Sequence, residues 1–99
     1  MNIETNLSAS AMNKIVSSGG SLGGSPAVGV VTYVTLSFVT AITSGECHVA
    51  CAAGLAPGDW FTSDADGLAV KVTTGFALGR ILSAPVDGLA LAVIGAVNL

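Results

Sequence analysis

Apolar and polar residues alternate along the middle of the chain with the two-residue period of a β-strand. Between residues 28 and 43, one face of this pattern carries large apolar side chains, namely Val28, Val30, Val34, Leu36, Phe38 and Ile42. Most of the stretch is β-branched, which favours strand over helix. Run straight, it would extend about 50 Å at roughly 3.3 Å per residue. We therefore expect a bend or a break within it before Ser44-Gly45 ends the pattern.

Short strands separated by turn residues follow in the second half of the chain, as in small barrels and sandwiches. The predicted strands are Glu46–Ala52, Trp60–Ser63, Leu68–Thr73, Ala77–Leu82 and Leu89–Val97. Asp64–Gly67 predicts a tight hairpin, because Asp and Gly readily adopt the positive φ that such turns require. After this turn, Leu68, Val70 and Val72 are expected to face inward and Lys71 to face water.

Residues 1–27 differ from the rest in being rich in Ser, Gly and Asn. They predict a flexible arm, with a short helix over Ser8–Val16 and a linker over Ser17–Pro26. An arm that docks on a partner and a disordered leader without a role both fit this composition. The fold class that follows is all-β: a small antiparallel β-barrel or sandwich over residues 28–99 with an extended N-terminal arm. On this interpretation, deleting residues 1–25 leaves the β domain folded.

The last predicted strand has no polar face, and the composition of the whole chain shows the same excess of apolar residues. Of the 99 residues, 52% are hydrophobic and 9% are charged, against about 25% charged in an ordinary soluble domain. A single small core cannot hide so many apolar side chains. The surplus must be buried in a membrane or against other protein molecules.

The membrane alternative rests on a long uncharged stretch. No Asp, Glu, Lys or Arg occurs between Lys14 and Glu46, a length that could span a bilayer. The stretch is, however, β-branched and interrupted by Ser and Thr, and Met1–Glu4 lacks the basic region of a secretory signal. We therefore expect protein partners, no membrane, and synthesis in a cytoplasm where Cys47 and Cys51 remain thiols.

The formal net charge is −3, and the only Lys and Arg residues are Lys14, Lys71 and Arg80. Nucleic acid is therefore not expected as a partner, since phosphate binding requires clustered basic side chains. Cys47-His48-Val49-Ala50-Cys51 is the one cluster worth testing as a metal site. On a strand its two cysteines lie about 13 Å apart, and the chain offers no second His.

The sequence also lacks the residue patterns of a catalytic site or a calcium site. Asp59, Asp64, Asp66 and Asp87 sit at turns, where hydrogen bonds to the local backbone account for them. The fragment from Asp64 to Gly67 lacks the later ligands of a calcium loop, and a Ser or Cys nucleophile would have only His48 as a base. The sequence therefore predicts no catalytic residue, no cofactor and no metal ligand, and a protein that is not an enzyme.

Aromatic side chains are few, so an exposed one is a candidate anchor for a partner. Trp60 and Phe61 are adjacent and would point to opposite faces of a strand. The candidate interface residues are Tyr33, Phe38, Trp60 and Phe61. The sequence leaves open which of the rings face outward.

The second half of the chain resembles the small head decoration proteins of tailed bacteriophages. The resemblance is carried by APGDWFTSDADGLAVK from Ala56 to Lys71, by Gly75 and Ala77–Ala84, and by Asp87-Gly88. These segments make a Gly-Asp strand, an Asp-x-Gly hairpin, a Gly-Arg strand, and a Gly turn that leads to an apolar final strand. They cover about the last forty-five residues, and their motifs are short.

The resemblance implies a β-rich capsid cement protein that binds the outside of an icosahedral shell, often as a trimer. Its partners would be the major capsid protein and further copies of itself. It would be made in the host bacterial cytoplasm and end on the outer surface of the virion. Its function would be structural, in viral assembly and shell stabilisation, with the N-terminal arm lying across a neighbouring capsid subunit.

Three alternatives remain open. A tail, fibre or pilus-like subunit would use the same apolar surface for head-to-tail contacts. A small membrane-associated protein would use it in lipid. A carrier-type hammerhead domain is suggested by Ala84–Gly88, but its modifiable Lys would stand at a hairpin tip, whereas Lys71 lies within a strand pattern.

Overall fold

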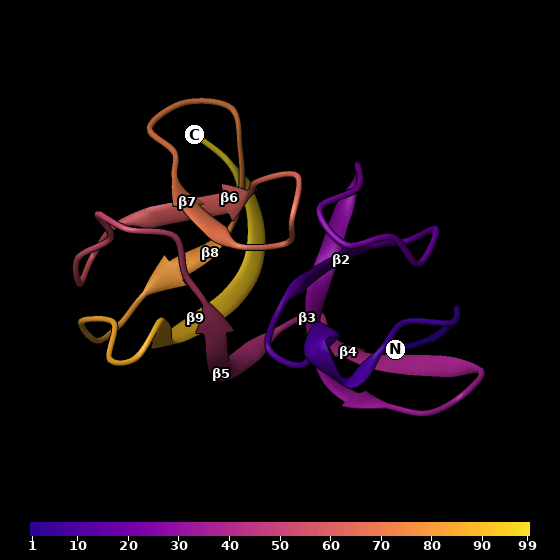
Figure 1. Ribbon diagram of the computed structural model, residues 1–99. Helices are drawn as coiled ribbons and strands as arrows, with labels where there is room; N and C mark the ends of the chain where they lie inside the picture. Colours follow the sequence, from indigo (N-terminus) through magenta and orange to yellow (C-terminus); the bar gives the residue numbers. More distant parts are fainter.

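The computed structural model describes residues 1–99 and is built almost entirely of antiparallel strands in two sheets (Figure 1). The first sheet has the order β1-β4-β3-β2 and contains β1 (Asn2–Glu4), β2 (Ile15–Ser17), β3 (Ala27–Val34) and β4 (Phe38–Ile42). The second has the order β5-β9-β8-β6-β7 and contains β5 (Gly45–Ala50), β6 (Trp60–Ser63), β7 (Ala69–Lys71), β8 (Phe76–Ile81) and β9 (Leu89–Asn98). The helical content is one short 3-10 turn, η1 (Ala9–Ala11). The predicted all-β fold class is confirmed.

The expected break in the long strand pattern lies between β3 and β4. The backbone N–H of Thr35 donates to the carbonyl of Phe38 over 2.9 Å, and the Thr35 hydroxyl donates to the same carbonyl over 3.0 Å. Leu36 and Ser37 form the tip of the resulting hairpin. After β4 the chain passes through residues 43 and 44 directly into β5, and so from the first sheet into the second.

Residues 64–67 form the predicted hairpin turn between β6 and β7. One carboxylate oxygen of Asp64 accepts the backbone N–H groups of Asp66 and Leu68, each over 2.9 Å. Gly67 has a φ of +82°, and a Cβ at this position would come within 2.8 Å of the Ile15 carbonyl. A residue with a side chain would therefore be strained and crowded there.

The inward face predicted for the strand after this turn is wrong. The turn sets a register in which Ser63 pairs with Ala69 and Phe61 with Lys71. Ala69 therefore shares the face of Phe61 and is fully buried, whereas Val70 lies half-buried on the opposite face. The hydrogen bonds of the turn, rather than the apolar pattern, decide which face points inward.

Two clusters of buried side chains make up the core. The larger one lies between the sheets, where Ile15 and Val30 of the first sheet join residues of the second, including Val49, Phe61, Leu78, Ile81, Ala90, Ala92 and Ile94. The smaller cluster comprises Ile3, Val16, Val31, Val39 and Ala41. Val30 and Val31 are consecutive on β3 and contribute to different clusters, because successive side chains of a strand point to opposite faces.

Residues 1–27 do not form the flexible arm that their composition predicts. They supply β1 and β2 to the first sheet, and bury Ile3, Ile15 and Val16. The predicted helix over residues 8–16 is replaced by η1 and the start of β2. The Gly-rich stretch folds back on β2, with the N–H of Ser17 donating to Ser21 over 2.9 Å. The small residues of the Gly-rich stretch therefore form tight turns and not a linker.

Candidate interaction surfaces

The second sheet has one face that is not covered by the first sheet, here called the outer face. Cross-strand pairing aligns Glu46, Val93 and Arg80 in one row that ends at Trp60. The apolar members of the outer face are Trp60, Val70, Val72, Leu82, Leu89, Leu91 and Val93. Leu82 is 43% exposed and Val93 37% exposed. Arg80 interrupts this apolar surface between Val93 and Trp60, and the first sheet leaves it uncovered.

Trp60 is held in place on the outer face by Arg80. The guanidinium carbon lies 5.6 Å from the centre of the indole ring, a cation–π distance. The Nε–H of Arg80 also donates to the carbonyl of Gly58 over 3.1 Å, and this hydrogen bond further restrains the guanidinium group. An ordered aromatic ring beside a positive charge suits a protein interface, where Trp and Arg are the commonest anchors.

A second exposed group lies on the β3–β4 hairpin. Tyr33 is 58% exposed and pairs with Thr40, two residues from the half-buried Phe38, so the two rings share one face. Leu36 at the tip is 94% exposed. Tyr33, Leu36 and Phe38 together are called the hairpin patch below.

The structure thus separates the four candidate aromatic residues. Trp60 lies on the outer face, whereas Tyr33 and Phe38 lie on the hairpin patch. Phe61 is fully buried in the larger core cluster and is removed from the interface candidates. Phe61 and Trp60 are neighbours on β6, so their side chains point to opposite faces of the sheet, and the Phe61 ring is the one that points inward. Sequence reasoning missed Arg80 and Leu82, although the alternation along β8 places both on the side opposite Ile81.

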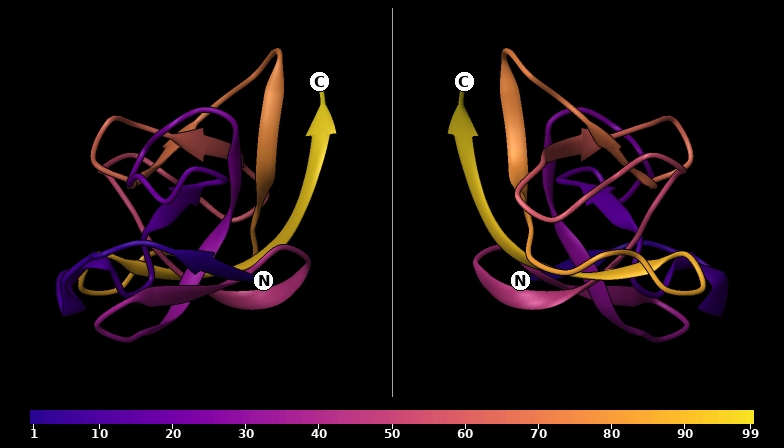
Figure 2. Two further views of the ribbon diagram at one scale, coloured as in Figure 1. Left: turned by 90° about the vertical axis from the view of Figure 1, so that its right-hand side faces the viewer. Right: turned by 90° about the vertical axis from the view of Figure 1, so that its left-hand side faces the viewer.

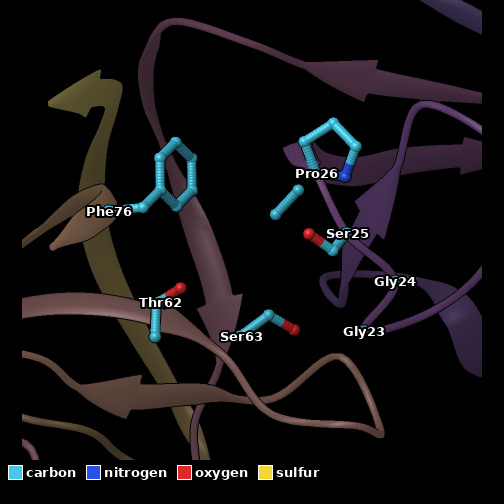
Figure 3. A pocket seen from close by; sticks show the side chains of 8 residues that line it. Gly23, Gly24, Ser25, Pro26, Thr62, Ser63 and Phe76 are labelled. Atoms are coloured by element: carbon cyan, nitrogen blue, oxygen red, sulfur yellow. The ribbon is translucent and has the colours of Figure 1, made fainter. Parts of the chain in front are cut away.

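A hollow of about 410 Å³ lies between residues 23–27 and the second sheet (Figure 3). Pro26 and Phe76 lie on opposite sides of it, and the hydroxyls of Ser25, Thr62 and Ser63 line it. No ionisable side chain contributes to its wall. Its chemistry is limited to hydrogen bonding and apolar contact.

The segment from Cys47 to Cys51 is not brought together as a site. Cys47 and Cys51 pack against the larger core cluster, whereas His48 is exposed on the opposite face of β5. Burial raises the pKa of both thiols, although a backbone hydrogen bond from Ala90 opposes the rise at Cys51. Raised pKa values leave these thiols protonated at neutral pH, the less reactive form.

Two of the turn carboxylates, Asp59 and Asp64, are accounted for by local structure. No group of three or more His, Cys, Asp and Glu side chains gathers anywhere in the chain. Asp59 accepts the N–H of Ala56 over 3.0 Å and lies 3.6 Å from the Lys71 ammonium. Asp64 holds its own turn, as described above. These two carboxylates therefore accept hydrogen bonds from the local backbone, and Asp59 also forms one surface ion pair.

Comparisons of the chain with protein-family models, with curated proteins and with solved structures gave no match. The fold contains no helix with the length and apolar character needed to cross a membrane. The geometry of the two exposed surfaces is therefore the basis for a functional proposal.

Proposed function

We propose that the chain is a capsid decoration protein, a structural virion protein that binds the outside of a bacteriophage shell and stabilises it. The observation that carries this proposal is the uncovered outer face, where Trp60, Leu82, Leu91 and Val93 gather with Arg80 as the one cation. The likeness of residues 56–88 to the motifs of phage decoration proteins supports the choice of partner. The function requires no catalytic residue, cofactor or metal.

The mechanism is mass action. A subunit that binds the assembled shell more tightly than the loose shell protein stabilises the shell by its differential affinity. In this contact the outer face would bury its apolar side chains, and Trp60 and Arg80 would be the residues that contribute most to binding. On the shell the subunits would stand as homo-oligomers, with the trimer as the proposed form, after synthesis in the host bacterial cytoplasm.

The experiment uses the major shell protein encoded in the same genome, both as assembled shells and as unassembled subunits. Purified chain is expected to co-sediment with the shells, to saturate, and to bind the unassembled subunits far more weakly. Binding to neither form, or equally to both, would contradict the proposal.

Two matched variants locate the contact. Leu82→Lys places a charge on the outer face and is expected to weaken shell binding by at least about tenfold. Leu36→Lys places the same charge on the hairpin patch and is expected to leave binding unchanged. Thermal unfolding of both variants controls for loss of fold.

A second candidate is a subunit of a filament, such as a tail or pilus-like fibre. The observation in its favour is that the hairpin patch and the outer face are separate apolar surfaces of one chain, as head-to-tail contacts require. Electron microscopy of the purified protein distinguishes the two, because open filaments would favour this candidate. Loss of filaments in Leu36→Lys would assign the contact.

A further inference from the structure

The strand β9 extends beyond the strand that pairs with it on one side. β5 pairs with β9 only as far as Ile94, where the partner is Gly45, whereas β8 pairs with β9 as far as Asn98. Residues Gly95–Asn98 therefore have a neighbour on one side alone. Figure 2 shows β8 and the end of β9 leaving the body together as a two-stranded ribbon.

The hydrogen bonds of this ribbon show which backbone groups are free. The N–H of Leu99 donates to the carbonyl of Gly75 over 2.8 Å, and Val97 is paired with Ala77. Groups that face the partner strand alternate along an antiparallel strand, so the N–H and C=O of Ala96 and Asn98 point away from β8. They form a short row of unpaired donors and acceptors.

This edge lacks the protection that the other edges have. β7 carries the exposed Lys71, β1 carries Glu4 and β5 carries Glu46. β2 is covered by the chain that follows it, where Gly23 donates its N–H to Ile15 over 3.1 Å. From Gly88 to Leu99 there is neither a charged residue nor a proline, two of the devices that protect a sheet edge from strand addition.

We infer that Gly95–Asn98 is a strand-addition site for a second copy of this chain. In the antiparallel pairing, Ala96 lies opposite Asn98 of the second copy and Val97 lies opposite its own counterpart. This arrangement is two-fold symmetric and forms about four backbone hydrogen bonds. It goes beyond the proposed function, since it requires no shell.

A second copy fits this edge better than a charged partner does. Neither strand brings a charged side chain to the contact, so no side-chain repulsion opposes the pairing, and the edge offers no charged side chain to complement one on another protein. Val97 is 38% exposed, and the two Val97 side chains would pack against each other across the symmetry axis. No atom lies within 4 Å of a Cβ built at Gly95, so the face of the ribbon is open at this position. Because the paired segment is short, the contact is weak and forms at high protein concentration.

The test compares wild-type protein with Ala96→Pro and Ala96→Val by sedimentation velocity over concentrations up to about 1 mM. Proline removes an N–H that bonds nothing within one chain, and valine keeps it. Wild type and Ala96→Val are expected to associate in pairs, and Ala96→Pro to dissociate at least tenfold more readily. Wild-type protein that does not associate, or equal association of all three, would overturn the inference.

Amide exchange in wild-type protein gives a second readout that no substitution can disturb. The Ala96 and Asn98 amides are expected to exchange more slowly as concentration rises, whereas the Val97 amide is protected throughout. Concentration-independent exchange at Ala96 would refute the pairing. Neither experiment contains shell protein, so the outcome is independent of the decoration proposal.

Discussion

Two adjacent aromatic residues of β6 have different environments. Phe61 is fully buried among residues of both sheets, and Trp60 lies on the outer face beneath the Arg80 guanidinium. The burial of Phe61 contributes to folding, whereas the area that Trp60 leaves exposed is available to a partner. In the proposed function, one ring of this dipeptide therefore stabilises the fold and the other is offered to the partner.

Phe61→Ala is expected to lower the free energy of unfolding by about 3–5 kcal/mol, because it leaves a cavity between the sheets. Trp60→Ala is expected to cost clearly less, since Trp60 is only partly buried and lies outside the core clusters. Guanidinium unfolding followed by circular dichroism measures both. Equal losses would contradict the assignment of the rings.

Gly79→Ala tests the close approach of β8 to its neighbours. A Cβ at Gly79 would collide with the Val93 carbonyl and lie 3.0 Å from the Phe61 ring. A loss of about 1–3 kcal/mol is expected from overpacking. Gly95→Ala, which meets open space, is the matched control and should change stability by less than about 0.5 kcal/mol. If both variants had the same stability, the tight contact at β8 would be disproved.

At the scale of the element, the β6–β7 hairpin depends on one carboxylate. Asp64→Ala removes the acceptor for the N–H groups of Asp66 and Leu68 and is expected to cost about 1–2 kcal/mol. Asp66→Ala is the control: Asp66 is exposed and contributes its backbone N–H to the turn, so the substitution should be nearly neutral. Thermal unfolding measures both, and a neutral Asp64→Ala would show that the turn forms without its side-chain bonds.

Local patterns predicted most strands but not the way they associate. Trp60–Ser63 has the predicted bounds, and β8 and β9 begin and end within about one residue of theirs. The inward face of β7 was missed because a turn register decided it. β1 and β2 were missed because each is three residues long, and only pairing with β4 and β3 makes them strands.

The candidate surface was predictable to a similar extent. The lack of a polar face on β9 was visible in the sequence, and the structure places Leu89, Leu91 and Val93 on the outer face, opposite the buried Ala90, Ala92 and Ile94. The approach of Arg80 to Trp60 depends on the β6–β8 register, which joins residues 20 positions apart. Contacts of this kind depend on the order and register of the strands, which cannot be predicted from a local sequence pattern.

At the scale of the whole molecule, residues 1–27 are part of the folded unit. Deleting residues 1–25 removes β1 and β2 and takes Ile15 from the larger core cluster. The shortened chain is expected to lose its cooperative thermal transition, measured by far-ultraviolet circular dichroism. An unchanged transition would restore the interpretation of these residues as a dispensable arm.

A smaller change tests the same dependence in the intact chain. Ile15→Ala is expected to cost about 2–5 kcal/mol, because Ile15 is fully buried between the sheets. Met12→Ala, at a side chain that is 39% exposed, should cost much less. Chemical denaturation compares the two, and equal costs would contradict the shared core.

The direct passage from β4 into β5 has a mechanical consequence. One stretch of backbone, interrupted only at residues 43 and 44, belongs to both layers. Because only two residues join these strands, the end of β4 and the start of β5 cannot separate by more than about 11 Å while the chain is intact. The two sheets are therefore tethered at this corner by covalent geometry, in addition to the contacts of Ile15 and Val30 with the second sheet.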